Sequence, residues 1–98
     1  MAIIAVMHIP GMTKEKYEES VRLIAGRSRM EKPSDWPVKG LLAHVAGQSP
    51  TGFRVIDVWD SEQAFQQFGE KLIPVLNQLG VEAQPEVYQA HTVVTAGS

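Results

Sequence analysis

The chain contains three histidines, His8, His44 and His91, and imidazole is the side chain that most readily exchanges a proton near neutral pH. Asp57 follows His44 after a short connection, residues 48–52, that contains a proline and a glycine. If residues 48–51 of this connection form the turn, His44 faces Val55 and lies diagonal to Asp57, at a backbone separation of about 7–8 Å. We therefore predict a His44–Asp57 pair in which the carboxylate orients an acid–base imidazole; a purely structural hydrogen bond is the equal alternative.

The composition excludes several other kinds of chemistry. The chain has no cysteine, so it has neither a disulfide framework nor a thiolate nucleophile or metal ligand. Its 9 Lys and Arg residues against 11 Asp and Glu residues give a formal charge of −2, which lacks the basic footprint of a nucleic-acid-binding protein. Nucleotide-binding and zinc-protease motifs are absent, and no H-x-H or H-x-x-E spacing suggests a metal site. We therefore predict chemistry without a metal or cofactor.

The length and the first residues bear on organisation and location. At 98 residues the chain has no room for separate cofactor and substrate domains, so residues 1–96 are expected to form one domain. Gly97 and Ser98 are set aside as an expression-tag remnant. The apolar run at residues 2–7 is too short for a membrane span and has no basic residue before it, so it does not resemble a signal peptide. We expect a cytoplasmic protein with no membrane or nucleic-acid partner.

Hydrophobic periodicity, interrupted by proline and glycine, divides the chain into six elements. Strands are predicted at residues 2–9, 40–47, 53–59 and 86–95, and helices begin after Thr13 and after Asp60 or Ser61. The second helix carries Pro74, which predicts a kink or a break near residues 69–73. The order β-α-β-β-α-β is the split ferredoxin-like arrangement of an α+β fold, with both helices on one face of a four-stranded antiparallel sheet.

Alternation along the strands divides the sheet into two faces, and the more uniformly apolar set is assigned to the helices. The helix-facing set is Ile3, Ala5, Met7, Leu41, Ala43, Val45, Ile56, Val58, Tyr88, Ala90 and Thr92. The opposite set is Ile4, Val6, His8, Leu42, His44, Ala46, Phe53, Val55, Asp57, Trp59, Val87, Gln89, His91 and Val93. Because the opposite set is mostly apolar, we expect a second copy of the chain to cover this face and form a homodimer.

Scattered polar side chains in an apolar field are typical of a small-molecule cavity. The polar members of the helix-free face include all three histidines, together with Asp57 and Gln89. The predicted walls of the cavity are Leu42, Phe53, Val55, Trp59 and Gln89, with packing as the favoured alternative for Trp59. The expected ligand is a small hydrophobic molecule.

Residues 52–65, GFRVIDVWDSEQAF, carry a resemblance to a known family. A strand ending in Trp59, followed by an acidic or serine cap and by Phe65 on the next helix, is similar to members of the dimeric α/β-barrel superfamily. It resembles in particular the antibiotic-biosynthesis-monooxygenase-like group. The resemblance implies two sheets paired into a barrel, and activities that include cofactor-independent oxygenation of aromatic polyketides, haem degradation and isomerisation.

Taken together, these features predict a small cofactor-independent enzyme, of the monooxygenase, cyclase or isomerase kind, acting on an apolar, aromatic or polyketide-like molecule. His44 is the candidate base, Asp57 its orienter, and His8 and His91 are candidate hydrogen-bond donors to a developing enolate oxygen. The alternative is a non-catalytic or stress-related barrel that binds a small hydrophobic ligand.

The connection at residues 27–38 is long for so small a domain and contains Trp36 between two prolines. One hypothesis is that Trp36 covers the mouth of the cavity and contributes to ligand binding, with Arg27, Arg29 or Lys32 available to an anionic group. The favoured alternative is that Trp36 packs against the first helix as structural filling.

Overall fold

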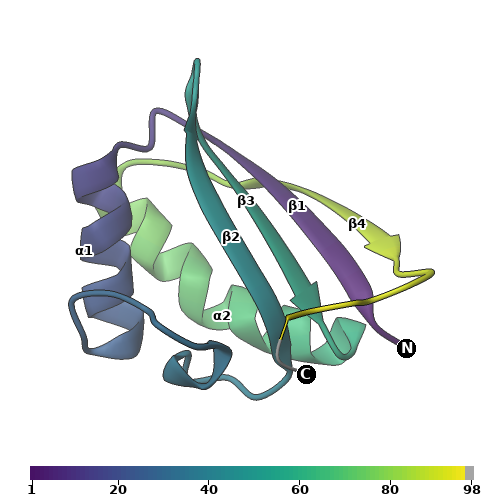
Figure 1. Ribbon diagram of the computed structural model, residues 1–98. Helices are drawn as coiled ribbons and strands as arrows, with labels where there is room; N and C mark the ends of the chain where they lie inside the picture. The colour runs from purple at the N-terminus through teal and green to yellow at the C-terminus, as the bar shows by residue number, and fades with distance from the viewer. Residues whose placement is uncertain (97–98) are drawn as a thin grey trace.

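The computed structural model describes residues 1–96, so the interpretation of residues 97 and 98 as a tag remnant lies outside the described residues. The elements follow the predicted order, with one added turn of 3-10 helix, η1, before the second strand (Figure 1). In chain order they are β1 (Ile3–Pro10), α1 (Lys14–Ala25), η1 (Pro33–Asp35), β2 (Leu41–Ser49), β3 (Gly52–Trp59), α2 (Glu62–Leu79) and β4 (Gln84–Gln89).

A tight turn and two caps set the limits of α1. The amide of Met12 donates to the carbonyl of Ile9 at 3.2 Å across Pro10 and Gly11, and Gly11 has a φ of 78°, as a type II turn requires. The Thr13 hydroxyl accepts from the amide of Lys16 at 3.1 Å, and Gly26 ends the helix in the left-handed conformation. The predicted limits of the first helix are therefore confirmed.

The second helix, α2, begins at the Ser61 cap, whose hydroxyl accepts from the amide of Ala64 at 3.1 Å. It runs without a break to its cap at Gly80, so of the kink or break predicted near residues 69–73, the break is wrong. Pro74 is exposed, and so the Glu70 carbonyl that loses its helical partner lies on the side of the helix that water reaches. Phe68, Leu72 and Leu76 form the buried stripe that holds α2 against the sheet.

The four strands form one antiparallel sheet in the order β2-β3-β1-β4, with β2 and β4 at its edges. Both helices cover the same face, as Figure 1 shows. The core lies between this face and the helices, where Trp59 and Phe68 are almost fully buried. The predicted ferredoxin-like α+β fold is confirmed.

The fourth strand is shorter than predicted. It occupies Gln84–Gln89, whereas the prediction extended it to residue 95. From Ala90, whose amide donates to the carbonyl of Ala2 at 2.9 Å, the chain leaves the sheet and turns back past the ends of the other strands (Figure 1). His91 therefore belongs to an exposed tail and not to the sheet.

The predicted division of the sheet into two faces is correct for β1 and wrong for much of the rest. In β1, Ile3, Ala5 and Met7 are buried against the helices, as expected. In β2, Leu42 is an extra residue in a bulge between Leu41 and Ala43, and this reverses the direction of every later side chain in the strand.

Pairing with β1 fixes the faces of β3 and β4. The helix-facing residues of β3 are Phe53, Val55, Asp57 and Trp59, the reverse of the predicted assignment. In β4, Val87 and Gln89 lie opposite Ala5 and Ile3 and share their face, so the assignment there is also wrong.

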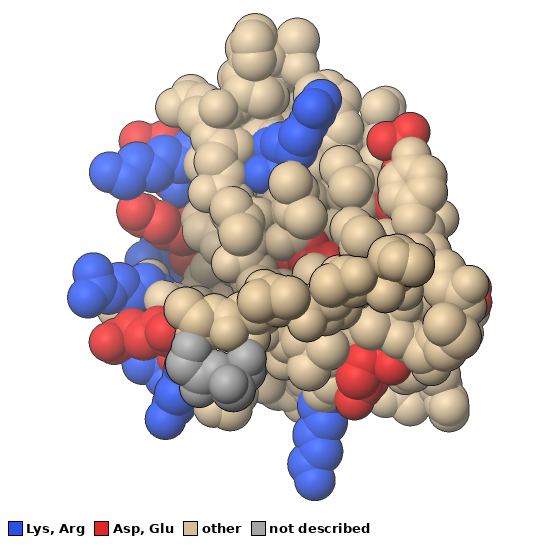
Figure 2. All heavy atoms as spheres, turned by 45° about the vertical axis from the view of Figure 1, so that its right-hand side comes forward, with Lys and Arg blue, Asp and Glu red and all other residues tan. Residues whose placement is uncertain are grey.

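The face without helices, called the outer sheet face below, is nevertheless apolar, although with different residues than predicted. Its apolar members by register are Ile4, Val6, Ala43, Val45, Ile56, Val58 and Tyr88. Val45 is 62% exposed and Ile56, its partner across the ladder, is 40% exposed. Figure 2 shows a broad uncharged surface, with most of the charged side chains gathered at its left border.

The connection between α1 and β2 is held by a buried carboxylate. One oxygen of Asp35 contacts the guanidinium of Arg27 at 2.6 Å, and the other accepts from the amides of Glu31 and Lys32 at 2.8 and 3.1 Å. These backbone hydrogen bonds chiefly hold the pKa of Asp35 below its ordinary value, with a contribution from Arg27. The Arg27 guanidinium is therefore engaged within the loop, so it is not the free cation that was predicted to bind an anionic group of the ligand.

In the described part of the chain, no helix combines the length and the apolar character needed to cross a bilayer.

Candidate functional site

The predicted pair of His44 and Asp57 is present, and a third residue extends it. His44 Nδ1 lies 2.6 Å from Asp57 Oδ1, and His44 Nε2 lies 2.7 Å from the hydroxyl of Tyr17. His44 comes from β2, Asp57 from β3 and Tyr17 from α1, so the three residues bridge the sheet and the helix layer. His44 and Asp57 are direct neighbours in the strand ladder, not diagonal ones, because the hairpin turn is only two residues long.

The direction of the hydrogen bonds follows from burial and charge. Burial raises the pKa of Tyr17 above its ordinary value of 10.0, and the nearby charge of Asp57 raises it further. Tyr17 therefore keeps its proton at neutral pH and can donate it to Nε2 of His44. With Nε2 as the acceptor, the Nδ1–H group donates to the Asp57 carboxylate, and this arrangement fixes one tautomer of the imidazole.

Aromatic side chains hold this hydrogen-bonded chain in place. Tyr17 stacks on Phe53 with ring centroids 5.3 Å apart, and Trp36 lies 5.9 Å from the ring of His44. Trp36 also contacts Phe68 of α2, and it is only 6% exposed. Trp36 is therefore packed against other side chains, as the favoured alternative expected, although on α2 and β2 where the first helix was predicted; its role as a lid stays a prediction.

The structure does not bring the other predicted polar residues to this site. His8 lies on the outer sheet face, where its Nε2 is 3.0 Å from the hydroxyl of Thr51 at the hairpin turn. Gln89 is exposed at the far edge and contacts the sulfur of Met1. His91 is in the exposed tail, and Leu42 occupies the bulge with 41% exposure. The predicted site on the helix-free face is thus replaced by a site between the sheet and the helices.

Three buried polar atoms near this site have no hydrogen-bond partner among the described residues: Asp57 Oδ2, Trp36 Nε1 and Trp59 Nε1. A small internal cavity of about 20 Å³ is lined by His44, Asp57 and Trp36, together with Val55 and side chains of α2. Native proteins seldom leave buried polar atoms without a hydrogen-bond partner. Three such atoms near one another are therefore unusual for a region that only packs the core.

A larger pocket, of about 420 Å³, opens beside Tyr17 and His44 and is called the β2-edge pocket below. It lies among α1, the loop after it, and strands β2 and β3, and its apolar walls include Phe53 and Met30. Its volume is within the range of small-molecule sites. The hydroxyl and imidazole of the hydrogen-bonded chain thus line a space that a ligand can enter.

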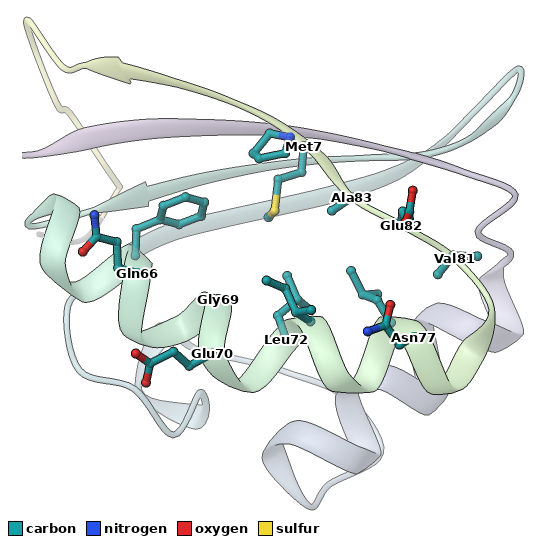
Figure 3. A pocket seen from close by; sticks show the side chains of 13 residues that line it. Met7, Gln66, Gly69, Glu70, Leu72, Asn77, Val81, Glu82 and Ala83 are labelled. Atoms are coloured by element: carbon teal, nitrogen blue, oxygen red, sulfur yellow. The ribbon is translucent and has the colours of Figure 1, made fainter.

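A second depression, of about 610 Å³, lies between α2 and the β1–β4 edge of the sheet (Figure 3). Figure 3 shows Met7 and Leu72 directed into it, while Glu70 and Gln66 lie at its rim. Its lining is mainly apolar, and it contains none of Tyr17, His44 and Asp57. It therefore offers a mainly apolar space apart from the hydrogen-bonded chain.

Tyr17 was not among the site residues predicted from the sequence. The available signal was its phenol, since a tyrosine on an inward stripe needs a partner for its hydroxyl. Within residues 1–96, no three histidine, aspartate or glutamate side chains gather closely enough to hold a metal.

The fold and site can now be compared with known proteins. No protein-family model matches the chain, and no curated protein matches it in sequence. Solved structures of antibiotic-biosynthesis-monooxygenase-like proteins do match its fold.

One is a mutant form of SnoaB, a cofactor-independent oxygenase from Streptomyces nogalater, with a TM-score of 0.63 at 11% identity over 95% of this chain and 96% of that one. A proposed antibiotic biosynthesis monooxygenase from Deinococcus radiodurans matches over 100% of both chains, with a TM-score of 0.57 and 19% identity. A proposed monooxygenase from Shewanella loihica PV-4 matches over 94% of this chain and 96% of that one, with a TM-score of 0.58 and 17% identity.

These likenesses confirm the predicted resemblance at the level of the fold. Identities of 11–19% do not carry an activity from one protein to another, because one fold serves many functions. The function must therefore be argued from Tyr17, His44 and Asp57.

Proposed function

We propose that this protein is a small cofactor-independent enzyme that removes a proton from an apolar, aromatic substrate in the β2-edge pocket. The observation that carries the proposal is the hydrogen-bonded chain Tyr17–His44–Asp57, which ends on a pocket of suitable size. Its resemblance in fold to a cofactor-independent oxygenase supports the same class of chemistry.

In the proposed reaction, His44 is the base and Asp57 is its positioning residue. The carboxylate, fully buried, accepts from Nδ1 and stabilises the imidazolium that forms when Nε2 takes a proton. Tyr17 occupies Nε2 in the free enzyme, so it turns away to free Nε2 for the substrate proton and donates to the developing enolate oxygen. Tyr17 thereby takes the donor role that sequence reasoning gave to His8 and His91.

If the product is an oxygenated one, the deprotonated substrate itself supplies the electrons. An activated CH₂ group reacts with O₂ to give a carbonyl group and water, so no external reductant is required. The protein has only to form the carbanion and to exclude bulk water from it.

The test uses aromatic ketones with an acidic CH₂ group, such as 2-tetralone. Proton abstraction is followed as deuterium incorporation by NMR in D₂O, and oxygenation as O₂ uptake. We expect His44→Ala to slow exchange by about 10²–10⁴-fold with ligand affinity nearly unchanged, and His8→Ala to have no effect. Equal rates in the wild-type chain and in His44→Ala would overturn the proposal.

The second candidate function is binding of a small hydrophobic ligand without turnover. The depression between α2 and the β1–β4 edge favours it, because it is large and apolar and contains no acid–base residue of the site. Ligand binding that persists in His44→Ala, with no exchange in the wild-type chain, is the result expected for this function.

We also propose that two copies pair through their outer sheet faces to form a homodimer. The support is the row of exposed apolar side chains around Val45, Ile56 and Tyr88, since sheets with a solvated face normally alternate apolar and polar residues. The reducing interior of the cell remains the expected location, as the absence of cysteine indicated.

A further inference from the structure

The β2-edge pocket has a charge distribution that its acid–base chemistry does not need. Besides Tyr17 and His44, its lining includes two cationic residues, Lys14 and Arg29, and one anionic residue, Glu18. The whole chain carries a formal charge of −2, whereas the charged residues that line this pocket have a formal excess of positive charge.

The basic residues of the pocket have no acidic partner among the described residues. In the described residues, Arg22 is paired with Glu19 at 2.7 Å, and Arg27 is paired with Asp35 and Glu31. Neither Lys14 nor Arg29 forms an ion pair in that part of the chain. Their charges are therefore available to a ligand.

Glu18 offsets only one of the two positive charges, so the charged residues of the lining keep a formal excess of positive charge. Lys14 is also the first residue of α1, where the positive end of the helix dipole adds to its own charge.

The cationic and acid–base groups belong to one pocket that also has an aromatic wall. Lys14, Tyr17 and Val21 are spaced three and four residues apart and so share one face of α1. Phe53, stacked against Tyr17, gives a flat surface for an aromatic ring. A ligand that satisfies these features has an aromatic body and one anionic group.

We propose that the β2-edge pocket selects aromatic carboxylates, with Arg29 and Lys14 binding the carboxylate while the ring lies against Phe53 and Tyr17. This rests on the proposed function only in placing the substrate in the same pocket. Arg29 is the main determinant, because its planar guanidinium can bind a carboxylate through two hydrogen bonds. Lys14 adds a point charge.

The test is a binding experiment that requires no turnover. The probes are 2-naphthoate and its neutral analogue methyl 2-naphthoate, titrated by calorimetry and by ¹H–¹⁵N NMR, which shows which residues the ligand contacts. We expect the anion to bind more tightly than the ester and to shift the signals of Arg29, Tyr17 and His44. Arg29→Gln should weaken binding of the anion about fivefold and leave the ester unchanged, and Lys14→Gln should act in the same direction.

Arg54→Gln is the matched control, because Arg54 is exposed on the outer sheet face and should not affect either probe. Equal affinity for the anion and the ester, or an anion affinity unchanged in Arg29→Gln, would overturn the proposal, as would the absence of naphthoate binding to the wild-type chain. Selective binding of the anion together with no proton exchange on any ketone would overturn the proposed enzyme and leave this subsite standing.

Discussion

His44 and Asp57 face each other directly across β2 and β3, with Nδ1 and Oδ1 2.6 Å apart. The carboxylate is fully buried, whereas 14% of the histidine side chain is exposed, so the pair has a closed end and an open end. The closed end fixes the tautomer, and the open end presents Nε2 to Tyr17 and to the pocket. This polarity is what a positioned base needs, because the orienting group is shielded while the reacting nitrogen is accessible.

The raised pKa of Tyr17 predicts a loss of stability in alkaline solution. The folded state holds the phenolic proton more tightly than the unfolded state does, so this contribution is fully present below pH 10 and is lost as pH rises through the higher pKa of the folded chain. Chemical unfolding measured between pH 8 and pH 11 should show the free energy of unfolding falling in the wild-type chain and falling less steeply in Tyr17→Phe.

Leu23→Ala is the control for this experiment, since Leu23 is 42% exposed on the same helix and has no titrating group. It should keep the wild-type slope. Parallel slopes for wild type and Tyr17→Phe would contradict the assignment.

Asp35 predicts the opposite pH dependence in the loop after α1. The hydrogen bond from the Glu31 amide is the main cause that lowers the pKa of Asp35 from 3.8. The ionised carboxylate therefore stabilises the loop fully above pH 3.8. This stabilisation is lost as the pH falls through the lower pKa of the folded chain. Asp35→Asn should show faster hydrogen exchange at the amides of Glu31 and Lys32 already at neutral pH. Glu82→Gln, which changes an exposed carboxylate, is the control. Unchanged exchange in Asp35→Asn, or equally fast exchange in Glu82→Gln, would argue against this role of Asp35.

Replacing Trp36 with alanine should lower the stability of the fold without changing the rates of ligand binding and release. It is 6% exposed and packs on Phe68 and His44, so Trp36→Ala should lower the free energy of unfolding by about 3–5 kcal/mol, the range for truncating a buried large aromatic. Denaturant unfolding measures the change, with Ile73→Ala, at a residue 60% exposed on α2, as the control that should lose far less. Little loss of stability, together with altered ligand on- and off-rates, would support the lid hypothesis.

If the outer sheet face is a dimer interface, one charged side chain placed in it should prevent dimer formation. Val45 and Ile56 are direct ladder neighbours, so a lysine at position 45 would place a charge in an apolar interface. Light scattering at micromolar concentration should give a dimeric mass for the wild-type chain and a monomeric mass for Val45→Lys, with unchanged circular dichroism.

The comparison for that experiment is Ile73→Lys on α2, because Ile73 is 60% exposed and Val45 is 62% exposed. It should remain dimeric. A monomeric wild-type chain would refute the dimer.

The sequence by itself determined the elements, their order and the fold, because these depend on local signals. Thr13 and Gly26 limit α1 through hydrogen bonds and a backbone conformation that act within one turn, and the turn at Pro10 and Gly11 does the same for β1. The pairing of His44 with Asp57 was also predictable, since every short hairpin that keeps both side chains on one face places them opposite or diagonal to each other.

Only the tertiary structure decided which face of the sheet carries the site. Two facts defeated the alternation rule: the extra residue Leu42 reverses β2, and in β3 the outward residues Ile56 and Val58 are as apolar as the inward ones. Where both faces of a sheet are apolar, side-chain type cannot distinguish them, and a shift of one residue exchanges them. The partnership of Tyr17 with His44, 27 positions apart, depends on how α1 packs across the sheet, which no local pattern encodes.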